Sequence, residues 1–167
     1  HILNKHVPER VLNTPFKHIQ QINDRDQRSI GGLKKAIRLC KNVKADAERD
    51  GTKIELSSYD IASALWHADM AALTVGIANE LAILAEATRF LDDLARRLNY
   101  ACTLRVPDES RFVFDSEAKI EGLRLLSLEM DDLSERVARE QSKAPWLWQT
   151  PSTGLVFEEL RKAYVPG

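Results

Sequence analysis

The chain has 167 residues, of which 44% are hydrophobic, and this size and composition fit one globular domain with a sizeable core. The formal net charge of −1 does not by itself point to a partner, whereas two cysteines argue against a disulfide framework and no Cys/His cluster has zinc-site spacing. No segment is apolar for long enough to span a membrane and no targeting sequence is visible, so we expect a soluble, cytoplasmic protein with no metal site of its own.

The N-terminal part predicts one helix between two irregular segments. Residues 1–13 show no period, and we expect them to be extended or irregular. Thr14 and Pro15 have the pattern of an N-cap and a first helical residue, which predicts a helix to about Asn23. Residues 24–29 are polar and predict a turn. The apolar residues expected to share one side of this helix are Phe16, Ile19 and Ile22.

A long basic helix follows, and it is the most informative part of the chain. Between Arg28 and Lys44 there are six basic residues and no acidic one, which predicts a local positive stripe in a nearly neutral protein. Lys41 lies at the border between this stripe and the apolar arc, so its stem can rest on apolar neighbours while its ammonium reaches a cleft. The residues of the apolar arc are Leu33, Ala36, Ile37, Leu39, Cys40, Val43 and Ala47.

The connection to the next helix carries clear signals at both ends. Gly51 is expected to end the basic helix as its C′ residue. Ser57 and Asp60 have the spacing of a capping box, which places Ser58 and Tyr59 in the first turn of the next helix. Unpaired N–H groups and the positive end of the helix dipole suit an anionic oxygen at this position, and an aromatic ring beside a phosphate can stack on a base.

The rest of the chain predicts further helices joined by one long loop. In chain order the elements are a helix over about 58–68, a central helix over about 73–100, a loop over 103–115, a helix from 115 or 116 to about 140, and a short helix over 155–164. The apolar residues spaced for burial are Ile61, Ala64, Leu65, Ala68, Ile77, Leu81, Leu84, Leu91, Leu94, Leu98, Ile120, Leu123, Leu128, Leu133 and Val137.

These elements predict an all-α fold, a bundle of four to five helices with an irregular N-terminal segment and tail. We expect a single helical domain over residues 1–167, with a core bundle at 14–141 and a tail at 142–167. Because the chain begins at His1 rather than Met, we expect it to be a fragment or a processed chain.

The order of Lys41 and then Leu-Ser-Ser-Tyr at 56–59 resembles the helical domain that follows the catalytic core in poly(A) polymerases, oligoadenylate synthetases and cyclic GMP-AMP synthase. In that family the lysine and serine contact the triphosphate and the tyrosine stacks on the base. The resemblance therefore implies nucleotide-binding roles for Lys41, Ser58 and Tyr59. The neighbouring candidates for accessory phosphate contacts are Lys34, Arg38, Lys44 and Ser57.

The resemblance also implies chemistry that this chain does not contain. Catalysis in the family needs a Gly-Ser turn followed by paired acidic residues on strands, which hold the metal ions that activate the attacking hydroxyl. The sequence has no Gly-Ser dipeptide and no strand pattern with two alternating carboxylates. The implied partners are the protein's own N-terminal catalytic domain and ATP or another nucleoside triphosphate with Mg²⁺, and the chain alone is expected to be inactive. Alternatively, this is a helical domain that kept only the packing.

A different class of function fits the basic helix as well. A stand-alone helical module could bind nucleic acid or protein through the stripe, and phosphate-backbone binding would weaken steeply with salt. A purely structural oligomerisation bundle would bind neither nucleotide nor nucleic acid.

Three other groups of residues invite a functional interpretation but have a simpler structural one. We interpret Asp108, Arg111 and Asp115 as a salt-bridged turn, and His67 beside Asp69 as a partly buried histidine. The tryptophans at 146 and 148 could stack on a base, but a tail folded onto the core is the simpler interpretation.

Overall fold

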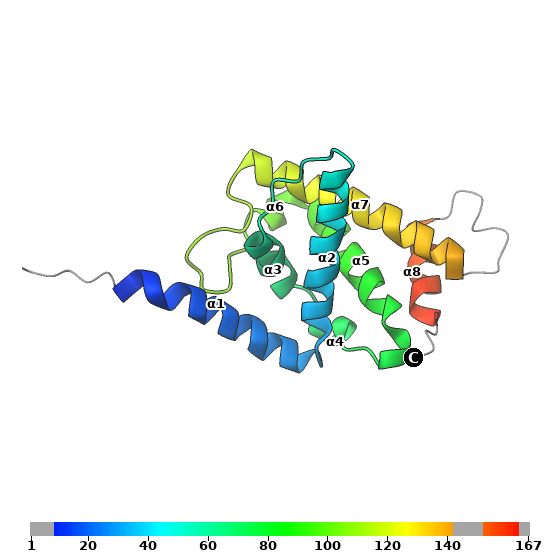
Figure 1. Cartoon of the computed structure of the whole chain (residues 1–167), viewed down its shortest axis with the longest axis horizontal. Coiled ribbons are helices and arrows are strands. Elements are labelled where there is room, and N and C mark those ends of the chain that lie inside the picture. Colours follow the sequence, from blue (N-terminus) through cyan, green and yellow to red (C-terminus); the bar gives the residue numbers. More distant parts are fainter. Residues whose placement is uncertain (1–8, 142–151, 164–167) are drawn as a thin grey trace, which may run out of the picture.

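The structure is a computed structural model, and it describes residues 9–141 and 152–163. These residues form helices, with one isolated antiparallel bridge between Arg105 and Phe112 and no longer strand. The predicted all-α fold is therefore confirmed (Figure 1). The elements are α1 (Glu9–Arg28), α2 (Gly32–Arg49), α3 (Ser58–Trp66), α4 (Met70–Leu73), η1 (Ile77–Asn79), α5 (Leu81–Arg96), α6 (Leu98–Ala101), α7 (Glu117–Gln141) and α8 (Thr153–Lys162).

Helix α1 is longer than predicted at both ends. It begins at Glu9, within the segment expected to be irregular, and Pro15 lies inside it instead of at its start. It also continues through residues 24–28, which were predicted to be a turn. Polar side chains at and just after this end bond free N–H groups at the start of the next helix. The Asp26 carboxylate accepts the N–H of Lys34 at 2.8 Å, and the Ser29 hydroxyl accepts that of Leu33 at 2.9 Å. The turn itself is confined to the residues around Gly31, whose φ is +85°.

The predicted apolar side of α1 is only partly buried. Ile22 is 8% exposed, whereas Phe16 and Ile19 are 68% and 54% exposed, so the prediction was wrong for these two. The reason is tertiary, because the first part of α1 projects beyond the other described helices (Figure 1), and on this part of the helix it is His18, not Phe16 or Ile19, that packs against another helix, through Tyr59.

The core lies where α2, α5, α7 and α8 pack together. Six of the seven residues of the predicted α2 arc are buried and Leu39 is partly buried, so that arc is confirmed. The Cys40 sulfur lies 3.9 Å from the Met130 sulfur on α7. Burial raises the pKa of the Cys40 thiol to about 12, which leaves it a packing group and not a nucleophile at neutral pH.

The central run predicted as one helix over 73–100 is instead divided into α4, η1, α5 and α6. The first break comes at Thr74, which has an extended conformation and donates its hydroxyl to the Met70 carbonyl at 2.7 Å. Gly76 follows, and Ile77 is 81% exposed although its spacing predicted burial. The second break is at Arg97, with φ −112° and ψ 59°. Local chemistry at Thr74 and Arg97 therefore overrides the helical period.

Helices α7 and α8 agree with the predicted elements in position but not in every buried residue. Leu123, Leu126 and Met130 of α7 are buried, whereas Leu128, predicted to face the core, is 62% exposed. Helix α8 packs on α5 and α7 through Val156 and Leu160. Trp146 and Trp148 lie outside the described residues.

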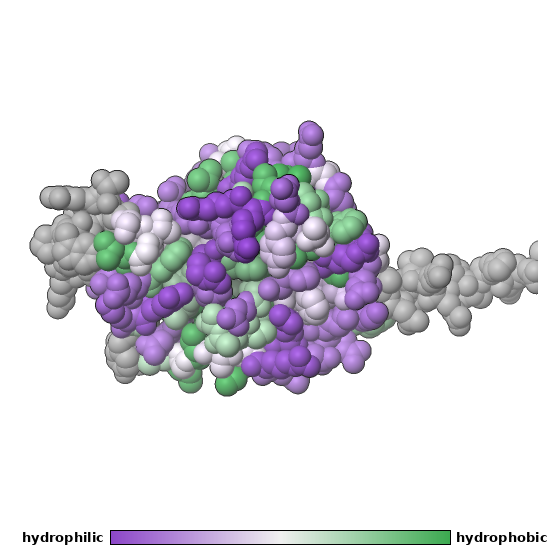
Figure 2. Space-filling model, turned by 180° about the vertical axis from the view of Figure 1, so that it is seen from behind, coloured by the Kyte–Doolittle hydropathy of each residue, from purple (hydrophilic) through white to green (hydrophobic). Residues whose placement is uncertain are grey.

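The surface mixes polar and apolar residues. Seen from behind, hydrophilic residues cover much of the molecule and hydrophobic areas are scattered among them (Figure 2). None of the helices in the described part is long and apolar enough to cross a membrane.

The α5–α7 contact holds a carboxyl group whose replacement should stabilise the fold. Burial, and then the Asp92 carboxylate, raise the pKa of Asp131 to about 6. A carboxyl group whose pKa is raised in the folded state favours folding only when it is protonated. The free energy of unfolding therefore falls as the pH rises from the ordinary carboxyl pKa through about 6. We expect Asp131→Asn to raise the free energy of unfolding at neutral pH by about 1–2 kcal/mol and to remove this pH dependence. Urea titrations at several pH values measure both effects.

Asp132→Asn makes the same charge change at a neighbouring, exposed position and should change stability little. Equal effects of the two substitutions would contradict the assignment to Asp131.

Candidate nucleotide-contacting site

The turn between α2 and α3 brings the end of one helix to the start of the next. Gly51 has a φ of +97°, and its N–H bonds the Glu48 carbonyl at 3.2 Å while the Thr52 N–H bonds the Ala47 carbonyl at 2.9 Å. This is the Schellman arrangement, and it confirms Gly51 as the C′ residue of α2.

The predicted capping box at the start of α3 is confirmed. The Ser57 hydroxyl accepts the N–H of Asp60 at 3.1 Å, and the Asp60 carboxylate accepts the N–H of Ser57 at 2.9 Å. The Ser57 hydroxyl also donates to that carboxylate at 2.6 Å, so it is engaged within the chain. Ser58, the first residue of α3, is exposed.

The basic residues of α2 differ in how far they are already paired. Lys34 lies 3.5 Å from the Asp26 carboxylate, and Lys44 lies 3.1 Å from Glu48. Within the part of the chain that the structure describes, no carboxylate lies within ion-pair distance of Arg38 or Lys41, and both are exposed. These two cations are therefore the ones most available to an external anion.

The Tyr59 ring is half-buried against the core and is held from two elements. His18 of α1 stacks on it with ring centroids 4.0 Å apart, and the Arg111 guanidinium lies 5.1 Å from its centroid. Burial, followed by the neighbouring Asp108 carboxylate, raises the pKa of Tyr59. The ring is neutral and well positioned at neutral pH, with part of its surface left open.

A buried carboxylate ties the long loop after α6 to the start of α3. The Asp60 side chain is 3% exposed, and its carboxylate lies 2.6 Å from Arg111 and 3.3 Å from Lys119. Lys119 also pairs with Asp115 at 2.8 Å, and Arg111 lies 3.5 Å from the same carboxylate. The predicted salt-bridged turn is therefore confirmed for Arg111 and Asp115, whereas the Asp108 carboxylate instead accepts the N–H of Ser110 at 3.0 Å. Burial raises the pKa of Asp60, but hydrogen bonds from Ser57 and Arg111 outweigh it, and the pKa lies below its ordinary value.

Beside this network lies a hollow of about 350 Å³ that brings together Lys44 and Ser57 from the predicted set with Lys119. Sequence reasoning missed Lys119, although its place four residues after Asp115 is the spacing of a helical ion pair. Lys41, Ser58 and Tyr59 are not among the residues that line this hollow. Across the described residues, no hydrogen bond or ion pair joins Lys41 to Ser58 or Tyr59.

Two further expectations concern His67 and metal ions. The His67 ring is half-buried and its Nε2 lies 2.7 Å from the Arg105 carbonyl, which confirms the structural interpretation of this residue. Among the described residues, no three or more His, Cys, Asp or Glu side chains lie together in a way that could hold a metal ion.

Comparison with known proteins gives a consistent result. Residues 20–131 match the family of cGAS/DncV-like nucleotidyltransferase C-terminal helical domains. A cyclic dinucleotide synthase CdnE from Yersinia aleksiciae is 40% identical over 145 residues, which are 86% of this chain and 38% of that protein. A c-di-GMP synthase from Lachnospiraceae bacterium (strain RUG226) is 45% identical over 47 residues, which are 28% of this chain and 13% of that protein.

The fold agrees with these matches. The structure of the STING-associated CdnE c-di-GMP synthase from Capnocytophaga granulosa is similar with a TM-score of 0.68 and 30% identity, over 75% of this chain and 40% of that one. This chain thus spans well under half the length of the relatives it matches. Because the family match covers most of the helical bundle, the chain belongs to the cGAS/DncV-like nucleotidyltransferase C-terminal helical domain family.

Proposed function

We propose that this chain is the nucleotide-contacting helical domain of a cyclic dinucleotide synthase whose catalytic residues lie outside it. The observation that carries the proposal is the 40% identity to the Yersinia synthase over 145 of the 167 residues, a stretch long enough that it includes the whole segment from α2 to the start of α3. The names of the other relatives point to the same class of product.

Within that domain, we propose Lys41, Ser58 and Tyr59 as the nucleotide contacts. Lys41 is an exposed cation without a carboxylate partner in the described part of the chain, so its ammonium is free to neutralise phosphate charge. Ser58 offers an exposed hydroxyl at a helix N-terminus, where the dipole favours an anion. Tyr59 is half-buried with His18 stacked on its ring at 4.0 Å, and on this proposal a base stacks on the same ring, in place of His18 or beside it.

The accessory contacts divide into two groups on this proposal. Arg38 is exposed and unpaired in the described residues, and Lys44 lies on the hollow beside Ser57, so both can add positive charge near a triphosphate. Lys34 is paired with Asp26, and the Ser57 hydroxyl is bonded to Asp60. Either group could contact a phosphate only by giving up that partner.

The parent enzyme, on this proposal, uses nucleoside triphosphates with Mg²⁺ held by its catalytic domain, and the metal supplies activation of the attacking hydroxyl. That domain is also the proposed cover for the exposed side of α1. Phe16 and Ile19, at 68% and 54% exposure, form an apolar surface that a second domain would bury.

Two measurements test the proposal. The 167-residue chain incubated with nucleoside triphosphates and Mg²⁺ should give no product, whereas the longer protein that contains it should make a cyclic dinucleotide. Turnover by the 167-residue chain alone would contradict the assignment of the chemistry to another domain. Sequencing the gene upstream of His1 should then reveal the Gly-Ser turn and paired carboxylates.

The stacking role of Tyr59 has its own test in the longer protein. Tyr59→Leu should raise KM for the nucleotide about tenfold, since stacking on an aromatic ring is worth roughly 1–3 kcal/mol per base. Tyr59→Phe keeps the aromatic ring, so its KM for the nucleotide should stay close to that of the unmodified enzyme. Equal losses in the two variants would show that the hydroxyl, and not the stacking surface, is what matters.

A further inference from the structure

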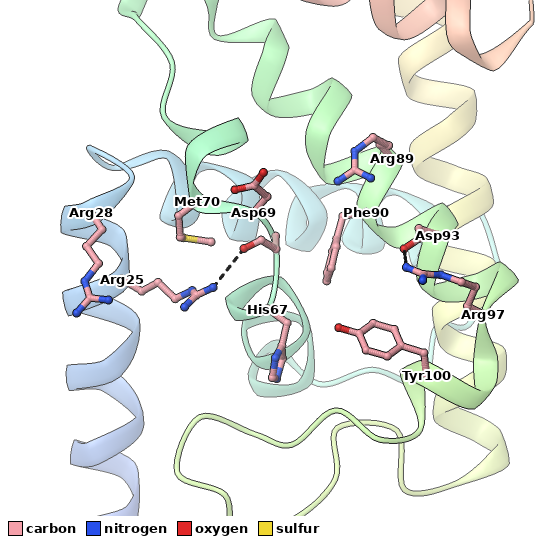
Figure 3. Close-up of a pocket in the computed structure, with 11 residues that line it drawn as sticks. Arg25, Arg28, His67, Asp69, Met70, Arg89, Phe90, Asp93, Arg97 and Tyr100 are labelled. Atoms are coloured by element: carbon pink, nitrogen blue, oxygen red, sulfur yellow. Dashed lines mark hydrogen bonds and ion pairs between the residues drawn. The ribbon is translucent and has the colours of Figure 1, made fainter.

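A second hollow, of about 600 Å³, lies where α1, the end of α3, α4, α5 and α6 meet (Figure 3). Its walls carry four arginines, which come from both sides: Arg25 and Arg28 from α1, and Arg89 and Arg97 from α5 and its end. We call it the arginine cleft. The cleft adjoins the C-terminal end of α3, whereas Ser58 lies at the N-terminal end of that helix. A helix of nine residues is about 13 Å long, so the cleft is separate from the proposed nucleotide contact at Ser58.

The arginines on the two sides of the cleft differ in their partners. Arg89 holds Glu86 through two hydrogen bonds of 2.9 and 2.6 Å, and Arg97 pairs with Asp93. These contacts orient the two guanidiniums from within α5. They also neutralise much of the charge on that side.

On the α1 side, neither Arg25 nor Arg28 has such an ion pair in the described part of the chain. Arg25 lies 3.4 Å from the Ala68 carbonyl and 4.7 Å from the centre of the Trp66 ring, and neither is an anion. Burial and then the charge of Arg28 lower the pKa of Arg25, and the Asp69 carboxylate offsets only part of this, so a repulsion between the two guanidiniums remains. An anion bound between them would relieve that repulsion.

The remaining charge indicates how large that anion can be. Four arginines face two aspartates, Asp69 and Asp93, across the cleft, and Glu86 neutralises Arg89 from outside it. The excess positive charge is small, and it suits one phosphate group of about −1.5 to −2. A triphosphate would bring uncompensated negative charge close to both aspartates.

Aromatic side chains complete the walls. Phe90 is 7% exposed and forms part of the lining, while Tyr100 is 45% exposed and lies under the Arg97 guanidinium at 5.2 Å. Figure 3 shows the Tyr100 ring reaching from α6 into the cleft opposite His67. A planar group entering the cleft would thus meet an aromatic face, and the volume lies in the range of small-molecule sites.

We propose that the arginine cleft binds a small compound with a single phosphate group and a planar ring, the phosphate lying against Arg25 and Arg28 and the ring against Tyr100. A nucleoside monophosphate has this chemistry. The proposal is independent of the nucleotide contacts assigned to Lys41, Ser58 and Tyr59.

The test is calorimetric titration of the 167-residue chain with AMP, ribose 5-phosphate, inorganic phosphate and adenosine. AMP should bind most tightly, the two phosphates without a ring more weakly, and adenosine most weakly. Arg28→Gln should weaken AMP binding about tenfold through the lost charge-assisted contact. Tyr100→Leu should weaken AMP binding about tenfold and leave inorganic phosphate binding unchanged.

Two control variants separate this site from general charge effects and from the proposed nucleotide contacts. Arg124→Gln removes the same charge from an exposed position on α7 and should leave AMP binding unchanged. Lys41→Ala should leave it unchanged as well. Circular dichroism checks that each variant is folded.

Several results would overturn the proposal. They are failure of all four probes to bind, adenosine binding as tightly as AMP, equal losses in Arg28→Gln and Arg124→Gln, or loss of AMP binding in Lys41→Ala. The last result would place the bound AMP at the α2–α3 junction and leave the proposed function standing.

Discussion

Lys41→Ala in the longer protein should weaken triphosphate binding about ten- to hundredfold, because losing a charge-assisted hydrogen bond to phosphate costs about 1.5–3 kcal/mol. The free energy of unfolding should barely change. Lys41 is exposed and has no ion-pair partner in the described residues, and such lysines contribute little to folding. Nucleotide titration of a catalytically blocked form measures the affinity, and a urea titration measures the stability.

Lys35→Ala is the matched control for this experiment. Lys35 is on the same helix and is exposed, but it is already paired with Glu80, the residue before α5, which is not part of the α2–α3 junction. Triphosphate affinity should be unchanged in this variant. If both substitutions weaken binding equally, Lys41 acts only through the net charge of the helix, and the specific contact is refuted.

Arg111→Ala should have the largest effect on stability, a loss of about 2 kcal/mol, because it leaves a buried carboxylate with fewer partners. The Asp60 side chain is 3% exposed, and Arg111 supplies its 2.6 Å contact, although Lys119 and the capping box remain. The Arg111 side chain is 34% exposed, so solvent screening keeps the loss below that of a fully buried pair. In the longer protein, KM for the nucleotide should also rise, since the guanidinium over the Tyr59 ring is lost.

The pH dependence gives a second readout for the same variant. Asp60 has a lowered pKa in the fold, so its contribution is present above the ordinary carboxyl pKa and is lost as the pH falls through the folded value. Without Arg111 the folded pKa rises, and acid unfolding should begin at a higher pH. Urea midpoints between neutral and acidic pH record the shift.

Arg105→Ala is the control from the same loop. Its guanidinium lies over the Phe112 ring at 4.4 Å and donates to the Glu109 carbonyl at 2.9 Å, without a carboxylate partner in the described residues. Arg105→Ala should therefore lower the free energy of unfolding much less than Arg111→Ala does. Two results would refute the role of the Asp60–Arg111 pair. One is an equal loss of unfolding free energy in the two variants, and the other is a pH of acid unfolding that Arg111→Ala leaves unchanged.

Much of the local structure around the candidate site could be predicted from the sequence. The capping box of Ser57 and Asp60 and the C′ role of Gly51 depend on residues that are close in the chain, and the structure confirms both. The buried arc of α2 follows from the helical period over a helix of 18 residues. The roles of Lys41, Ser58 and Tyr59 in binding remain predictions.

The positions of residues far apart in the chain required the tertiary structure. His18 stacks on Tyr59, and Arg111 reaches Asp60 across 51 positions, and no local pattern indicates either contact. The arginine cleft likewise gathers arginines from α1, α5 and the end of α5, and their positions in the sequence do not indicate that they lie together.

The helical period alone gave wrong predictions of helix length and of burial at some positions, where local hydrogen bonding or the absence of a packing partner decided the structure. The central run was predicted as one helix because its leucines recur regularly, but Thr74 and Arg97 leave the helical conformation and divide it. Phe16 and Ile19 are apolar yet exposed, since burial depends on what lies opposite a side chain. The sequence by itself determined the all-α class and the helix junction, because these depend on short-range periodicity and capping. It indicated the family through the resemblance of Lys41 and residues 56–59 to a known helical domain. Only the tertiary structure decided which charges are paired and which cations stay free, because ion pairing depends on distances in space between residues that the chain order does not bring together.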